Sequence, residues 1–166
     1  MRTEWRLEQG EYKPVVIADD GTETPVTWAA QAGSQQAALS CPITEVLLTG
    51  TRGPGKSDTM LMDFAQHVGH GFGGDWNGII FRRTFPELKD IINKSRKWFP
   101  RIWPRAKFNA SQYIWTWPTG EMLSFRQFNK PADYWKYHGH CLDEGEVLTS
   151  CGWVPIGVKS CFIARY

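Results

Sequence analysis

The sequence predicts an α/β fold in which a parallel sheet carries flanking helices. Two short apolar runs, Glu45–Thr49 and Gly78–Arg82, have the length and aliphatic content of buried strands. Each run is followed by a stretch whose apolar residues have helical spacing, one beginning at Lys56 and the other near Thr84. Strands that alternate with helices in this way are typical of parallel sheets with crossover connections.

Composition limits the kind of protein. The 166 residues, of which 42% are hydrophobic and 22% charged, allow one globular domain with one core. The aliphatic runs are far shorter than the ~20 apolar residues that cross a bilayer, so we expect no membrane span. The net charge of +2 is too balanced for a generally basic nucleic-acid binder. Four cysteines without a C-x-x-C pair indicate reduced thiols, and we expect a cytoplasmic protein.

Residues 1–26 are expected to form an N-terminal arm or an irregular hairpin, because they mix charges with glycine and proline and show no sustained period. The α/β domain is expected to span residues 27–140. Within it, the buried strand Glu45–Thr49 comes first. An amphipathic helix should run from Lys56 to about Val68, and a glycine-rich loop should follow it.

The second half of this domain is predicted from local signals. Thr84–Glu87 matches a capping box with proline in the first turn, which predicts a helix that ends at Phe99–Pro100. The runs Gln112–Trp117 and Glu121–Phe125 flank Pro118–Gly120, so a hairpin is expected there. Beyond Asp133 the pattern weakens.

The segment from Gly50 to Ser57 is a full match to G-x-x-x-x-G-K-[ST], between an apolar strand and an amphipathic helix. Its residues are Gly50, Thr51, Arg52, Gly53, Pro54, Gly55, Lys56 and Ser57. Glycines let several N–H groups point at one anion, and the helix presents its positive end to the same place. Lys56 would reach the β- and γ-phosphates, and the Ser57 hydroxyl would coordinate Mg²⁺. The alternative is an ordinary strand-to-helix turn.

Upstream of this loop, amide side chains are candidates for binding adenine. Gln31 and Gln35 can bond both the donor and the acceptor edge of the base, and Trp28 is available for stacking. The alternative is a polar loop that enters a helix through Ala37 to Leu39.

A basic stretch lies between Arg82 and Lys107, which contains nine basic residues and only two acidic ones, Glu87 and Asp90. The cations are Arg82, Arg83, Lys89, Lys94, Arg96, Lys97, Arg101, Arg105 and Lys107. The interleaved aromatics are Phe85, Trp98, Phe99, Trp103 and Phe108. This mixture suits a nucleic-acid path, where cations bind phosphates and rings stack on bases. It equally suits a solvated helix face whose aromatics belong to the core.

The stretch from about Trp28 to His140 resembles the N-terminal ATPase part of a tailed-phage terminase large subunit, a DNA-packaging motor. The segments that carry the resemblance are Gln31–Gln35, Glu45–Asp58, Ile79–Leu88, Trp117–Glu121 and Asp133–His140. The resemblance implies an ASCE-type P-loop ATPase that uses ATP and Mg²⁺ in the cytoplasm of a bacterial host. Its implied partners are double-stranded DNA, a portal protein, a small terminase subunit and, at full length, further copies of itself. It also implies that Gln31 and Gln35 lie beside adenine and that Arg52 senses the γ-phosphate.

The sequence departs from the family after His140. In the family an aliphatic strand ends in an acidic pair, whose Asp holds Mg²⁺ and whose Glu activates water. Here only Leu142 precedes Asp143 and Glu144, which are either that pair or a solvated acidic turn. Residues 141–166 resemble no part of the family, as truncation or a frameshift would explain. We therefore expect an ATPase domain incomplete at its C-terminus, with neither the nuclease domain nor its activity.

Three functions compete at this point. The first is an incomplete terminase ATPase that powers packaging of double-stranded DNA into procapsids. The second is a non-enzymatic remnant that binds nucleotide or partners without turnover. The third is another P-loop enzyme, such as a helicase or a nucleotide kinase.

Overall fold

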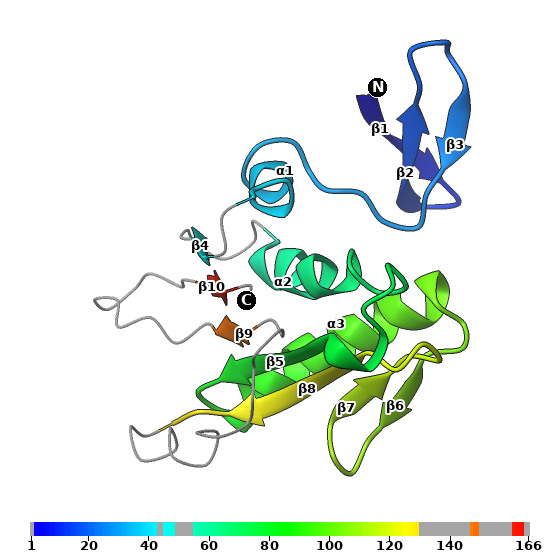
Figure 1. Cartoon of the computed structure of the whole chain (residues 1–166). Coiled ribbons are helices and arrows are strands. Elements are labelled where there is room, and N and C mark those ends of the chain that lie inside the picture. Colours follow the sequence, from blue (N-terminus) through cyan, green and yellow to red (C-terminus); the bar gives the residue numbers. More distant parts are fainter. Residues whose placement is uncertain (1, 43–44, 49–54, 130–146, 150–160, 165–166) are drawn as a thin grey trace.

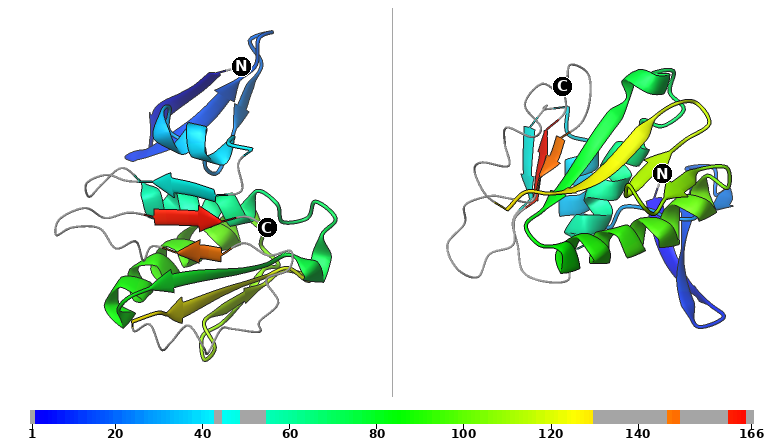
Figure 2. Two further views of the ribbon diagram at one scale, coloured as in Figure 1. Left: turned by 60° about the vertical axis from the view of Figure 1, so that its left-hand side comes forward. Right: turned by 90° about the horizontal axis from the view of Figure 1, so that it is seen from below.

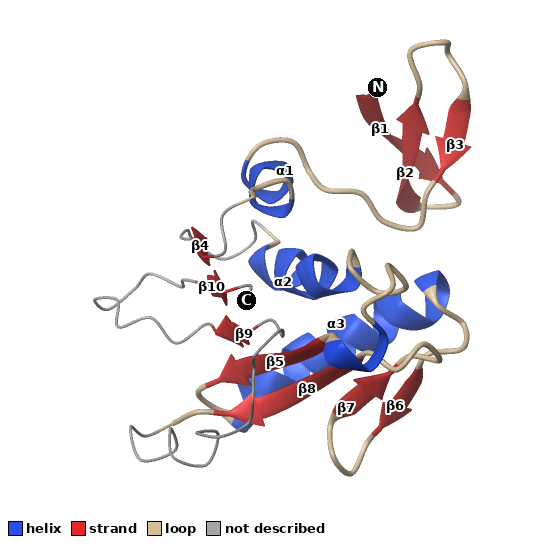
Figure 3. Cartoon of the chain, in the orientation of Figure 1, coloured by secondary structure: helices blue, strands red, loops and turns tan. Residues whose placement is uncertain are grey.

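The computed structural model describes residues 2–42, 45–48, 55–129, 147–149 and 161–164. They form two sheets and three α-helices (Figures 1 and 3). One sheet has three strands in the order β1-β2-β3, and the other has seven in the order β4-β10-β9-β5-β8-β7-β6. No helix in these ranges is long and apolar enough to cross a membrane.

The N-terminal segment is more regular than the sequence predicted. It forms an antiparallel sheet of β1 (Arg2–Glu8), β2 (Glu11–Ile17) and β3 (Glu23–Pro25). Gln9 and Gly10, both with positive φ, make the tight turn between the first two strands. The expected arm or irregular hairpin is therefore a three-stranded sheet.

The seven-stranded sheet is mixed rather than wholly parallel. Its strands are β4 (Glu45–Leu48), β5 (Asn77–Arg82), β6 (Lys107–Asn109), β7 (Ile114–Thr116), β8 (Met122–Gln127), β9 (Val147–Thr149) and β10 (Cys161–Ala164). Central β5 pairs in parallel with both β8 and β9. The other pairs are antiparallel, including the predicted hairpin of β7 and β8.

Strand β4 differs from its prediction as a buried parallel strand. It lies at the sheet edge and pairs antiparallel with β10. Val46 and Leu48 are half-buried, whereas Leu47 is 57% exposed. An apolar run has the same pattern in an edge strand and in a central strand, so the sequence alone could not separate the two.

The helices are α1 (Ser34–Leu39), α2 (Lys56–Ala65) and α3 (Phe85–Ile102), and a short 3₁₀ turn, η1, covers Gly73–Asp75. Helices α2 and α3 lie on the same face of the large sheet (Figure 2). Thr84 stands at the N-cap of α3, but its side chain makes no capping hydrogen bond, so the predicted capping box is not formed. The helix also continues through Pro100, and the Trp103 N–H closes it on the Phe99 carbonyl at 2.7 Å.

Aromatic rings fill the core between these two helices and the sheet. Phe99 is fully buried, and its ring centroid lies 5.4 Å from that of Trp115 and 5.3 Å from that of Trp117. Ser95 is buried among them because its hydroxyl accepts the indole N–H of Trp115 at 2.9 Å and donates to the Ile92 carbonyl at 2.7 Å. The tryptophans of the predicted hairpin are therefore structural residues.

Candidate nucleotide-binding site

The predicted phosphate loop leads directly into α2. Lys56 and Ser57 are the first two residues of this helix, and both are half-buried. Gly55 is the N-cap residue and has the left-handed conformation, with φ of 73°. The remaining predicted loop residues lie outside the described residues; they are Gly50, Thr51, Arg52, Gly53 and Pro54.

Glycine is favoured at position 55 by its positive φ, which strains any residue that has a Cβ atom. A Cβ atom there would also lie only 2.0 Å from Nε2 of Gln35, so that side chain would have to move away from the Gly55 carbonyl. The Gly55 carbonyl accepts a hydrogen bond from that Nε2 and another from the Thr59 hydroxyl, both at 3.2 Å. The turn into α2 is thus fixed from two sides.

The Gln35 side chain points into the protein and forms hydrogen bonds there. It is only 5% exposed, and both ends of its amide group are bonded. Oε1 accepts the backbone N–H of Gln31 at 2.8 Å, while Nε2 donates to Gly55. Gln31 contributes its backbone, and its own side chain is exposed. The pair predicted to bind adenine therefore ties the segment before α1 to the start of α2.

Arg82 belongs to this site and was not among the predicted site residues. It is the last residue of β5, and its Nη2 donates to the Ser57 hydroxyl at 3.2 Å. The guanidinium group has five N–H donors, so it retains donors for a bound anion. A cation at the carboxyl end of a buried strand was the available signal, because the carboxyl ends of parallel strands meet at one edge of the sheet.

Asp58 connects the first turn of α2 to the middle of α3. Its carboxylate accepts a hydrogen bond from Lys94 Nζ at 2.8 Å and another from the indole N–H of Trp98 at 3.2 Å. An acidic residue in the first helical turn also suits the positive end of the helix dipole.

The basic stretch separates into inward aromatics and outward cations. Phe99 is in the core, and Trp98, Trp103 and Phe108 pack against it. Phe85 is 42% exposed, with its ring against that of Tyr113. The exposed cations are Arg83, Lys89, Arg96, Lys97, Arg101, Arg105 and Lys107. The interpretation of these aromatics as packing residues fits the structure, and the cations remain available on the surface.

The predicted acidic pair, Asp143 and Glu144, lies outside the described residues. In the chain these two residues precede β9, which begins at Val147. Within the described ranges, no group of three or more His, Cys, Asp or Glu side chains is placed to hold a metal ion. The described candidate for a Mg²⁺ ligand is thus the Ser57 hydroxyl.

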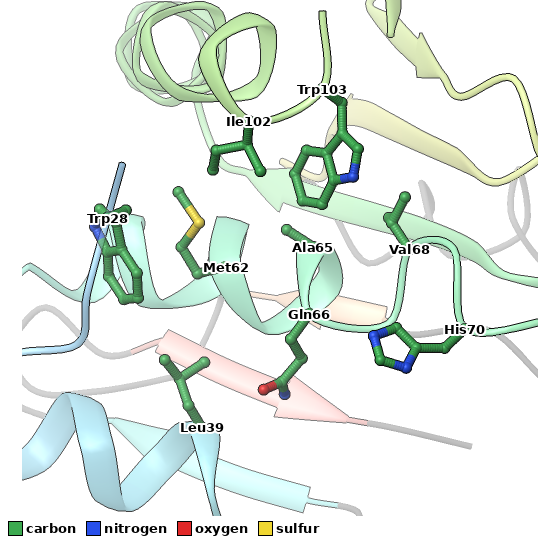
Figure 4. Close-up of a pocket in the computed structure, with 9 residues that line it drawn as sticks. All are labelled: Trp28, Leu39, Met62, Ala65, Gln66, Val68, His70, Ile102 and Trp103. Atoms are coloured by element: carbon green, nitrogen blue, oxygen red, sulfur yellow. The ribbon is translucent and has the colours of Figure 1, made fainter. Parts of the chain in front are cut away.

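A cavity of about 300 Å³ lies along the second half of α2 and the segment that follows it (Figure 4). It is lined by Trp28, Leu39, Met62, Ala65, Gln66, Val68, His70, Ile102 and Trp103. Trp28, which was predicted to stack on adenine, therefore packs beside Met62 and Leu39.

The residues present fit a phosphate group. A left-handed glycine begins the helix, Lys56 and Ser57 occupy its first turn, and the Arg82 guanidinium lies within hydrogen-bond distance of Ser57. Comparisons with protein-family models, with curated proteins and with solved structures found no match.

Proposed function

We propose that this chain binds ATP and Mg²⁺ at the start of α2 and is the ATPase part of a terminase-type DNA-packaging motor. The observation that carries the nucleotide proposal is the G-x-x-x-x-G-K-S motif, whose second glycine is a left-handed N-cap immediately before Lys56. A phosphate-binding loop needs this conformation because its N–H groups must converge on one anion.

Each residue has a role in this proposal. Lys56 binds the β- and γ-phosphates, and Arg52 senses the γ-phosphate. Ser57 and Asp143 hold Mg²⁺, which neutralises charge on the phosphates when bound, and Glu144 is the general base. Gln35 does not touch the nucleotide in this scheme; it keeps Gly55 in the conformation that the loop requires.

Arg82 donates to the same Ser57 hydroxyl that would coordinate Mg²⁺. A bound metal ion would repel the guanidinium cation from this oxygen, and Arg82 could then turn its donors to a phosphate oxygen. Arg82 would thus stabilise the empty site and afterwards contribute to the occupied one.

The motor part of the proposal is supported by the terminase-like segments and by the exposed cations of α3. Its partners would be double-stranded DNA, a portal protein, a small terminase subunit and further copies of the chain, in the cytoplasm of a bacterial host. A remnant that binds nucleotide without turnover is the second candidate, because in the sequence only Leu142 precedes Asp143 and Glu144, where the terminase pattern has an aliphatic strand. A helicase or a nucleotide kinase is the third.

Thermal unfolding with and without Mg²⁺-ATP tests the nucleotide proposal. A ligand at about 100 times its dissociation constant stabilises the folded state by about 2.7 kcal/mol, which is a shift of several degrees. Lys56→Ala should abolish the shift, and the matched control Lys89→Ala should retain it, because Lys89 is exposed on α3. If ATP produces no shift that depends on Lys56, the proposal is wrong.

Turnover then separates the three candidates. Phosphate release that double-stranded DNA accelerates supports the packaging motor. Transfer of phosphate to a nucleoside monophosphate supports a kinase, and stimulation by single strands supports a helicase. Binding without turnover supports the remnant.

A further inference from the structure

We propose that the outward face of α3 binds the phosphate backbone of duplex DNA. Four exposed cations make up this face, which we call the α3 basic face: Lys89, Arg96, Lys97 and Arg101. They occur at positions i, i+7, i+8 and i+12, a spacing that places residues on one side of a helix. The opposite side of α3 is buried against the sheet.

The dimensions and charge of this face suit a nucleic-acid backbone. Lys89 and Arg101 are twelve residues apart, about 18 Å along the helix axis. Duplex DNA carries one negative charge per ~1.7 Å of its axis, so several phosphates lie within this length. Exposed Arg105 and Lys107 continue the positive charge beyond the end of α3. The acids on the helix are Glu87 and Asp90, both exposed and near its beginning. Asp90 lies on the same side as the four cations and offsets one of their charges, which leaves the face net positive.

The aromatic rings near this face favour a duplex over a single strand. Proteins that bind single strands stack bases on exposed rings. Here the Lys97 ammonium lies over the Trp98 ring, 4.8 Å from its centroid, and the Arg96 guanidinium lies 5.7 Å from the centroid of Phe108. The cations therefore cover the rings, which leaves phosphates as the groups this face can recognise.

The same face is unsuited to a membrane surface. A helix that lies in a bilayer interface presents large apolar residues to the lipid beside its cations. Between Lys89 and Arg101 the exposed positions that hold no cation are Asp90, Asn93 and Pro100, none of which is a large apolar residue. A helix with an outward face of cations and small or polar residues binds an anionic polymer through charge alone.

Helix α3 also contacts the candidate nucleotide site. Lys94 and Trp98 hold Asp58 in the first turn of α2, one residue from Ser57. This part of the inference rests on the proposed function: a duplex on the α3 basic face should change ATP affinity through Asp58, and ATP should change duplex affinity by the same factor.

Fluorescence anisotropy with a labelled duplex of about 20 base pairs, across a salt series, tests the inference. The double variant Lys89→Gln/Arg101→Gln should lower the slope of log affinity against log salt by about 2, and removal of all four cations should lower it by about 4. A charge-preserving variant with Lys89→Arg, Arg96→Lys, Lys97→Arg and Arg101→Lys should bind as the wild type does. Arg6→Gln/Lys13→Gln, which removes two cations from the N-terminal sheet, should leave the slope unchanged.

Any of the following results would overturn the inference: no duplex binding by the wild type, tighter binding of the single strand, an unchanged slope in the double variant, or binding of phosphatidylserine vesicles in place of DNA. Loss of binding in the charge-preserving variant would do the same, because it would show that packing rather than charge matters. The Lys56-dependent thermal shift is measured separately. If that shift is absent while duplex binding persists, the proposed nucleotide site is wrong and DNA binding by the α3 basic face is supported. If the shift is present while duplex binding is absent, only DNA binding by the α3 basic face is rejected.

Discussion

The two ends of α2 are held in different ways. At its beginning, polar side chains make the contacts: Gln35 bonds to Gly55, and Arg82 bonds to Ser57. At its other end the Phe64 ring stacks on Trp76, with centroids 5.7 Å apart, and is fully buried. Hydrogen bonds can exchange one partner for another at a small net cost, whereas a packed ring cannot leave without a cavity. The packed end therefore supplies stability, and the polar end can adapt to a ligand.

Removal of the Phe64 ring should produce the largest effect on stability. Phe64→Ala is expected to lower the free energy of unfolding by about 3–5 kcal/mol, because loss of the ring leaves a new void in the core beside Trp76 and Trp117. Urea denaturation measures this loss. Phe72→Ala is the matched control, since Phe72 is 49% exposed and should cost far less. Equal losses of unfolding free energy in the two variants would show that the buried Phe64 ring contributes no more stability than an exposed ring, contrary to the role given to this end of α2.

A buried carboxylate at the packed end should make stability depend on pH. Glu121 is fully buried and accepts hydrogen bonds from the Gly69 N–H at 2.9 Å and from the Thr119 hydroxyl. Burial raises the pKa of Glu121, but the hydrogen bonds from Thr119, the Gly69 N–H and its own N–H outweigh it, so the pKa lies below its ordinary value. A lowered pKa in the folded state means that this stabilisation is present above the unfolded pKa, and is lost as the pH falls through the folded pKa.

Glu121→Gln should therefore cost about 1–3 kcal/mol near neutral pH, where the ionised carboxylate is best satisfied. The difference between variant and wild type should shrink as the pH falls below about 4.5, the ordinary value for this group. Melting temperatures of both proteins between pH 7 and about pH 3 measure it. Glu87→Gln, at an exposed position, serves as the control. A difference that stays constant over this range would contradict the assigned role of the charge.

Much of the fold could be predicted from local patterns, and the contacts at the polar end could not. Helical spacing of apolar residues located α2 and α3, and a continuous apolar run located β5. Helix α3 has one buried face as predicted, whereas α2 is buried on all sides from Thr59 to Ala65. The bonds of Gln35 to Gly55 and of Arg82 to Ser57 join residues 20 and 25 positions apart, which no periodicity records. The motif predicts a phosphate loop before α2, but it gives no indication that Gln35 turns toward Gly55.

The N-terminal sheet was missed for a different reason. The alternation of apolar and polar residues in β1 and β2 is hidden because charged residues stand among the apolar ones on both strands. Val15 and Ile17 are buried, while Arg6 on the neighbouring strand pairs with Glu23 at 2.7 Å. This ion pair joins the two outer strands, β1 and β3, across central β2, and both of its side chains are exposed. The register places Arg6 opposite Lys13, so neither the sequence pattern nor the strand pairing reveals this contact.

The smallest effect should come from the ion pair between Asp58 and Lys94. Their side chains are 21% and 43% exposed, so solvent screens the attraction, and a double-mutant cycle with Asp58→Asn and Lys94→Gln should give a coupling of about 0.2–1 kcal/mol. The Asn side chain retains an oxygen for the Trp98 indole, which limits the loss. A coupling as large as the cost of Phe64→Ala would mean that the polar end is also a main source of stability. A small coupling with an altered thermal shift by ATP would instead assign Asp58 to nucleotide binding, because the same contact would then matter more to the ligand than to the fold.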